Sequence, residues 1–158
     1  MPTTSASASL SSVLRSEGQH IETLSYALWS LRRNVLAGNV LADKTQDTDV
    51  LFALTQLRQL ELKRAMQATG LAEELRCAED APLLEIAQAL TEPWQAPLLA
   101  HHAALSAAVA EVDALTAEVS HHLLLATPGR NELADQLTTA VPRSLVWFLR
   151  APAGIRPT

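Results

Sequence analysis

The stretch LSSVLRSEGQHIETLSYALWSLRRNV, residues 10–35, decides the fold. Its apolar side chains recur at intervals of four and three residues, the heptad spacing of a helix that buries one seam against other helices. Glu17 occupies the seam position between Leu14 and Ile21. We predict a helix over about residues 10–37, which Gly38-Asn39 ends. The apolar seam positions are Leu10, Leu14, Ile21, Leu24, Leu28, Leu31 and Val35.

Three further helices are predicted after this one. The second spans about residues 46–69 and ends at Gly70, and its apolar face comprises Val50, Leu51, Leu54, Leu57, Leu60 and Met66. A short helix, about 81–90, begins at Pro82, and a long one, about 92–126, follows Thr91-Glu92-Pro93-Trp94. The heptad seam of this last helix comprises Leu98, His102, Leu105, Val109, Val112, Thr116, Val119 and Leu123.

Composition and length agree with an all-α domain. The chain has 158 residues, of which only 4% are aromatic, so its core must be mainly aliphatic. We predict an elongated antiparallel helical bundle of three long helices and one short helix. Residues 1–9 are predicted to be a flexible N-terminus, residues 10–126 the bundle, and residues 127–158 a hinge and a partly helical, amphipathic C-terminal tail.

Charge and cysteine content limit the classes of partner. The formal net charge is −5, and the basic residues are scattered with no basic stripe that could bind phosphates, so we expect no nucleic-acid binding. Cys77 is the only cysteine, which favours a reducing compartment. Residues 1–12 lack the pattern of a signal peptide, and no uninterrupted apolar run approaches the roughly 20 residues of a membrane span. We expect a cytoplasmic protein without membrane insertion.

Two Glu-x-x-His motifs raise the alternative of a di-iron bundle. Such bundles carry this motif on each of two helices, and the chain has Glu17-Gly18-Gln19-His20 and Glu118-Val119-Ser120-His121. Glu17 points inward, but Glu118 and His121 flank the seam residue Val119 and face outward. We instead predict that Glu17 is a buried polar residue paired with Arg58 or Arg64, with no metal, no cofactor and no catalytic residues.

The C-terminal tail is predicted to carry the binding surface or to cover the bundle. It follows a break at Thr127-Pro128-Gly129 and has an apolar stripe at helical spacing, interrupted by Pro142. Five consecutive apolar residues, 145–149, include two of the few aromatic side chains. A stripe of this kind is more often core than binding surface. Both roles are compatible if the tail docks weakly and swings away to admit a partner.

The order of these features resembles that of the FlgN-type flagellar export chaperones, over roughly residues 10–126. A long heptad helix is followed by Lys44 in a polar break and by a second helix. That helix contains Arg64 and ends in Thr69-Gly70-Leu71, and Trp94 opens the last long helix. The chain departs from the family in lacking asparagine midway along that helix, over 105–110.

The resemblance implies a cytosolic chaperone without ATPase activity. Such a chaperone holds hook-associated (hook–filament junction) proteins before export and delivers them to the flagellar export apparatus. In this family the C-terminal region contributes to substrate binding, which points here to Leu133, Leu137, Val141, Leu145, Val146, Trp147, Phe148 and Leu149. This implied function is compatible with the predicted fold, because a helical scaffold with an apolar groove can cover the amphipathic terminal helices of such substrates.

Two other functions stay open at the level of sequence. The first is a non-catalytic helical adaptor or regulator of an unknown partner. The second is the metal-dependent helical bundle that the Glu-x-x-His motifs suggest. Heptad seams are satisfied equally well within one chain or between chains, so monomer and dimer are both compatible with the pattern.

Overall fold

The computed structural model describes residues 2–38, 44–126 and 131–151, and these residues form six helices and no strand. The prediction of an all-α fold is confirmed. The helices are α1 (Pro2–Leu36), α2 (Lys44–Glu74), α3 (Leu83–Ala89), α4 (Gln95–Ala126), α5 (Asn131–Thr138) and α6 (Arg143–Phe148).

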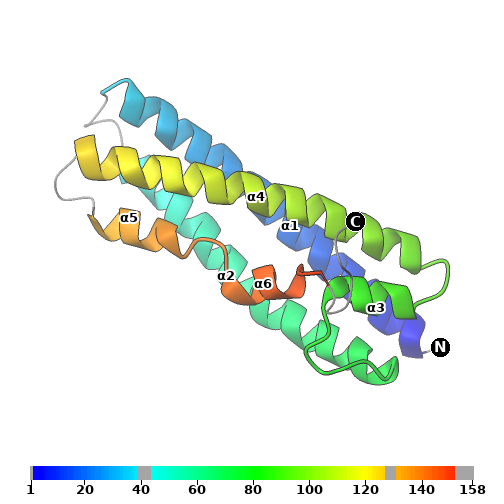
Figure 1. Cartoon of the computed structure of the whole chain (residues 1–158). Helices are drawn as coiled ribbons and strands as arrows, with labels where there is room; N and C mark the ends of the chain where they lie inside the picture. The colour runs from blue at the N-terminus through cyan, green and yellow to red at the C-terminus, as the bar shows by residue number, and fades with distance from the viewer. Residues whose placement is uncertain (1, 39–43, 127–130, 152–158) are drawn as a thin grey trace.

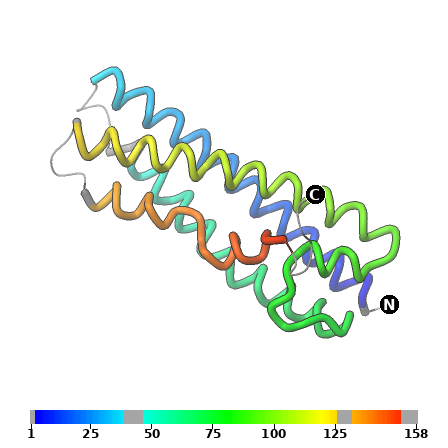
Figure 2. The backbone as a smooth tube through the Cα atoms, viewed as in Figure 1, coloured from blue at the N-terminus to red at the C-terminus, as the bar shows by residue number. Residues whose placement is uncertain are grey.

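The long helices α1, α2 and α4 lie side by side, and α1 packs against both of the others (Figure 1). The short helix α3 packs on α4 near one end of the molecule. After α4 the chain turns back, so that α5 packs on α4 and α6 reaches α2 (Figure 2). One continuous aliphatic core contains residues from all six helices.

The predicted seam of α1 is confirmed at Leu10, Leu14, Ile21, Leu24, Leu28 and Leu31, which are all buried, and Val35 is half-buried. The prediction of a flexible N-terminus over residues 1–9 is wrong from Pro2 onward, because the helix starts there. Proline is well tolerated in the first turn, and Ala6 and Ser7 pack into the core, so burial extends the helix beyond the heptad pattern. Gly38, with a φ of 71°, follows the helix end as predicted.

Helix α2 differs from its prediction at its end and on its apolar face. It continues through Gly70 to Glu74, since Leu71 and Ala72 extend the buried face and outweigh the roughly 1 kcal/mol cost of a helical glycine. Met66, predicted on the buried face, is exposed. Arg64 lies on that face instead, because the buried stripe runs through Val50, Leu57, Arg64 and Leu71 at heptad spacing.

The third and fourth helices agree with prediction within a few residues. The seam of α4 is buried except at His102, which is half-buried. By length and mean hydropathy the segment Gln95–Leu125 could cross a membrane, which a search for uninterrupted apolar runs did not reveal. In the structure 28% of that apolar window is buried, and α1, α3 and α5 pack against this helix.

Replacement by alanine should have opposite effects on stability at Gly70, which lies inside α2, and at Gly38, which follows the end of α1. At Gly70 an added Cβ meets nothing within 4 Å, and the residue is helical, so Gly70→Ala should raise the free energy of unfolding by about 0.5–1 kcal/mol. At Gly38 the positive φ strains any Cβ, so Gly38→Ala should lower it. Urea denaturation measures both. Stabilisation by both variants would contradict the assigned backbone conformations.

Candidate functional site

The eight tail residues predicted to bind a partner fall into two groups in the structure. Val146 and Trp147 are 49% and 56% exposed. The others face the bundle: Leu133, Leu137, Leu145 and Phe148 are buried, and Val141 and Leu149 are half-buried against the same core. Most of the tail stripe is therefore core, and its surface part is confined to two neighbouring residues on α6. The predicted hinge at Pro128-Gly129 lies outside the described residues.

Helix α5 docks on α4 mainly through apolar contacts. Leu133, Ala134 and Leu137 are buried, and the two helices are in direct contact. Ser120 of α4 donates a hydrogen bond from Oγ to the carbonyl oxygen of Ala134, at 3.4 Å. Pro142 precedes α6 and separates it from α5, so the tail consists of two short helices instead of one.

Helix α6 docks on a buried arginine. The guanidinium of Arg64 donates from Nη1 to Glu17 Oε1 of α1 at 2.6 Å. From Nη2 it donates to Glu61 Oε1 of its own helix at 3.4 Å and to Ser144 Oγ of α6 at 3.2 Å. Its Cζ atom lies 5.3 Å from the ring centroid of Phe148, within the range of a cation–π contact. We call Glu17, Glu61, Arg64, Ser144 and Phe148 the Arg64 cluster.

The Arg64 cluster confirms the prediction that Glu17 is a buried seam residue with an arginine partner. Of the two predicted partners, Arg64 makes the contact, whereas Arg58 is exposed. The side chains of Arg64 and Glu17 are only 2% and 1% exposed, so neither charge is solvated by bulk water. A buried ion pair of this kind stabilises a fold little by itself, but loss of one partner leaves an uncompensated charge.

The electrostatics of Glu17 reflect this burial. Desolvation is the largest influence and raises the pKa of Glu17 to about 6, against the opposing charge and hydrogen bond of Arg64. The nearby Glu61 carboxylate raises the pKa further. Oε2 of Glu17 is buried and has no hydrogen-bond partner in the described part of the chain, which fits the strong desolvation.

Two more contacts hold the end of α6. His102 of α4 donates from Nε2 to the carbonyl oxygen of Leu149 at 2.9 Å, because a carbonyl can only accept. Arg150 donates from Nη2 to the carbonyl oxygen of Asp80, before α3, at 3.2 Å. Its guanidinium stacks 3.6 Å from the ring centroid of Trp147 and also donates to the carbonyl oxygen of that residue. Trp147 therefore has the Arg150 guanidinium stacked on its ring, and it is still about half exposed.

The surface around Arg64 on which α6 packs, called the tail dock below, is not completely filled by α6. A hollow of about 120 Å³ lies between α2, the start of α3 and α6. Its lining includes Arg64, Ala68, Trp147 and Phe148. The most polar part of the dock and its most exposed aromatic ring thus border the same space. Sequence reasoning identified Arg64 and the aromatic residues separately, but not that they meet.

The residues of the Glu-x-x-His motifs have other roles in this structure. Glu17 pairs with Arg64, and Glu118 accepts a hydrogen bond from Nε of Arg32 at 2.8 Å. His121 is exposed. Within residues 2–38, 44–126 and 131–151, no group of three or more His, Cys, Asp or Glu side chains lies close enough to hold a metal ion. The two motifs do not converge on one site.

His101, the neighbour of His102, also contacts another helix. Its Nε2 lies 2.9 Å from Ser11 Oγ of α1. Burial lowers the pKa of His101, and the positive charge of Arg15 lowers it further. The pair His101-His102 therefore links α4 to α1 on one side and to the tail on the other.

Comparisons of the chain with protein-family models, characterised proteins and solved structures found no match. The resemblance to FlgN-type chaperones therefore stays a prediction.

Replacement of Arg64 should destabilise the fold strongly. In Arg64→Met the buried carboxylate of Glu17 loses its partner and α6 loses a hydrogen bond, so we expect a loss of about 3–5 kcal/mol in the free energy of unfolding. The double variant Arg64→Met/Glu17→Leu should recover a large part of this loss. Arg58→Met, on the exposed side of the same helix, is the matched control and should change stability by less than about 0.5 kcal/mol. Equal effects of the two single variants would refute a buried pair.

The stability of the protein should also depend on the proton of Glu17. Folding raises the pKa of this residue from an ordinary value of 4.5 to about 6, so the folded chain binds the proton more tightly than the unfolded chain. This contribution is complete below the unfolded pKa and is lost as the pH rises through the folded one. It amounts to about 2 kcal/mol.

The measurement compares urea denaturation of the wild type with that of Glu17→Gln across this pH window. The stability of the wild type relative to the variant should fall by about 2 kcal/mol between about pH 4.5 and pH 7. Because all other carboxylates are shared, they cancel in the difference. A difference that is flat or that rises with pH contradicts the assignment.

Proposed function

We propose that this chain is a non-enzymatic cytoplasmic export chaperone of the FlgN type. In this proposal it covers the amphipathic terminal helices of hook–filament junction proteins and delivers them to the flagellar export apparatus. One observation carries the proposal. The C-terminal tail lies in the bundle as two short amphipathic helices, and it leaves two large apolar side chains, Val146 and Trp147, on the surface.

The length of the tail helices supports an exchange with a partner. Helices α5 and α6 contain eight and six residues, and isolated helices shorter than about 12–15 residues are marginal in water. Both helices therefore stay folded because they pack on the bundle. The packing is made chiefly by Leu133, Leu137, Leu145 and Phe148. An amphipathic helix of a substrate offers the same chemistry in a longer segment, so it can compete for the same apolar surface.

The contacts of α6 suggest where such an exchange begins. Polar contacts hold α6 at Ser144, at the carbonyl of Leu149 and at Arg150, while Val146 and Trp147 remain open to solvent between them. A partner that first contacts Trp147 meets an exposed aromatic ring beside an incompletely filled hollow. Displacement of α6 then exposes its buried side chains, Leu145 and Phe148, and the apolar surface on which they pack.

We further infer that the long helices form the elongated antiparallel bundle that the heptad seams predict, with α3 as the short fourth helix. Figure 1 supports this inference for α1 and α2, which pack together and run in opposite directions, whereas α1 and α4, which also pack together, run in the same direction. Such a bundle gives the tail a rigid support. Rigidity matters, because a preorganised groove loses less conformational entropy on binding than a flexible one.

A helical adaptor for a different partner is the competing function. Large apolar side chains outside the tail, among them Tyr26, Phe52 and Leu62, are exposed, so the tail is not the only surface available for binding. Co-purification with a hook–filament junction protein favours the chaperone, and a stable complex with an unrelated protein favours the adaptor. Neither function needs a catalytic residue.

Binding of a hook–filament junction protein should depend on the exposed tail residues. The double variant Val146→Ala/Trp147→Ala leaves the buried tail residues intact and should weaken binding of the hook–filament junction proteins of the same organism by about tenfold or more. Isothermal titration calorimetry measures the affinity. Deletion of the tail is a poorer test, because it exposes the core at Leu133, Leu137 and Leu145.

Leu125→Ala is the matched control for this experiment. Leu125 is an exposed apolar residue of α4, so its truncation removes an exposed apolar side chain that belongs to neither α5 nor α6. The control should bind normally, and both proteins should keep the helicity of the wild type. Normal binding by the Val146/Trp147 variant excludes the tail as the site.

A further inference from the structure

Helix α2 carries a second apolar stripe on the side that faces away from the core. Phe52, Leu62 and Met66 are 64%, 68% and 67% exposed, although each is a large apolar side chain. Together with Thr55 and Gln59, also exposed, they follow the alternating three- and four-residue spacing of a coiled-coil seam. We call these five residues the outer stripe. It lies opposite the buried stripe through Leu57 and Arg64, since the two sets are about half a turn apart.

The pattern of the outer stripe is complementary to itself when two copies run in opposite directions. With a two-fold axis beside residue 57, Phe52 of one copy faces Leu62 of the other, and Thr55 faces Gln59. Phe52 and Leu62 then form an apolar contact on each side of the axis, and the hydrogen-bonding side chains meet beside it. Met66 lies beyond the paired residues, opposite position 48 of the other copy. A two-fold interface requires this kind of self-complementarity.

The charges beside the stripe select the antiparallel direction. Asp49 and Lys63 are exposed on the same flank of α2, one near each end of the stripe. In an antiparallel pair each Asp49 faces Lys63 of the other copy, so opposite charges meet twice. A parallel pair would instead bring Arg58 beside Lys63 of the other copy, twice, and like charges would repel. The antiparallel pair has one like-charge contact, because Arg58 lies beside Arg58 of the other copy near the axis, against two attractive Asp49–Lys63 contacts. Asp49 has no ion pair within the described chain, so it is available for such a contact.

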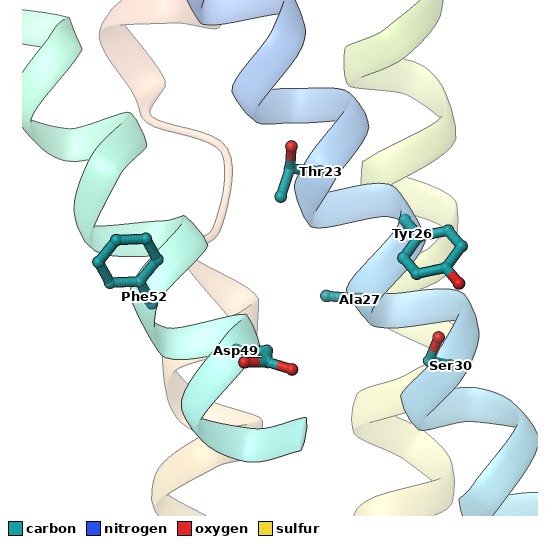
Figure 3. A pocket seen from close by; sticks show the side chains of 6 residues that line it. All are labelled: Thr23, Tyr26, Ala27, Ser30, Asp49 and Phe52. Atoms are coloured by element: carbon teal, nitrogen blue, oxygen red, sulfur yellow. The ribbon is translucent and has the colours of Figure 1, made fainter. Parts of the chain in front are cut away.

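A hollow beside Phe52 provides room for the second copy. It measures about 270 Å³ and lies between α1 and α2. Figure 3 shows Phe52 on one side, Tyr26 on the other, and Asp49 with the small side chain of Ala27 between them. Tyr26 is itself highly exposed. A lysine side chain can lay its aliphatic stem along such apolar walls while its ammonium group reaches the carboxylate. In the antiparallel pair, Lys63 of the second copy lies opposite this hollow.

We propose that the outer stripe of α2 is the interface of an antiparallel homodimer, in which Phe52 packs on Leu62 and Asp49 pairs with Lys63 of the second copy. This inference goes beyond the proposed function and does not depend on it. Arg64, which contacts the tail, lies on the inner side of α2, and the outer stripe lies on its outer side. Both tails therefore stay accessible in the dimer, and each copy can bind one partner.

The test is a charge exchange in the full-length chain, followed by sedimentation equilibrium over a range of concentrations. The wild type should be a dimer at high concentration. Asp49→Lys and Lys63→Asp should each raise the dimer dissociation constant by about tenfold or more, because each replaces two attractive contacts by two repulsive ones. The double variant Asp49→Lys/Lys63→Asp should return to within about threefold of the wild type.

Two controls separate the interface from general effects of charge and polarity. Asp113→Lys makes the same charge change at an exposed site on α4 and should leave the dissociation constant unchanged. Leu62→Glu places a charge against Phe52 of the second copy and should abolish the dimer, whereas Leu125→Glu on α4 should not. All the substituted residues are exposed, so circular dichroism should show wild-type helicity in each variant.

Three results would overturn the proposal. The first is a monomer at every concentration, in which case the outer stripe has another occupant or none. The second is a dimer that Asp49→Lys and Leu62→Glu leave intact, which places the interface elsewhere. The third is a failure of the double exchange to restore the dimer although each single variant breaks it, which excludes the antiparallel register.

Discussion

The Arg64 guanidinium is the interaction on which the arrangement of the molecule depends. It is a charged group inside an aliphatic core, and its hydrogen bonds reach Glu17 of α1, Glu61 of α2 and Ser144 of α6. Aliphatic side chains can slide past one another at small cost, whereas a buried charge without a partner costs several kcal/mol. The positions of α1, α2 and α6 along one another are therefore fixed by a polar contact and not by the apolar seams alone.

The contact of Arg64 with α6 lies in a tail helix that has both buried and exposed residues. Arg64 contacts α6 through Ser144 Oγ and the ring of Phe148, while Val146 and Trp147 of the same helix are exposed. Arg150 then stacks on the outward ring of Trp147. The tail thus joins the core and the surface within the six residues of α6.

Helix α2 likewise carries apolar residues on both a buried and an exposed side. Its inner side carries the buried stripe with Arg64, and its outer side carries exposed apolar residues at the same heptad period. A helix with two apolar stripes satisfies only one of them within a single bundle. The tail dock and the outer stripe therefore offer two separate surfaces, and binding at one does not obstruct the other.

The sequence by itself determined the helical class, the seams of α1 and α4, and the inward position of Glu17 with an arginine partner, because heptad spacing decides which residues share a helix face. It did not determine which face of α2 is buried near Arg64 and Met66, that α1 begins at Pro2, or which tail residues stay exposed. Tertiary contacts decided these, since both stripes of α2 have a helical period and only partners distant in sequence select one. Ser144, which binds Arg64, is 80 residues away from it, and no local pattern contains that pairing.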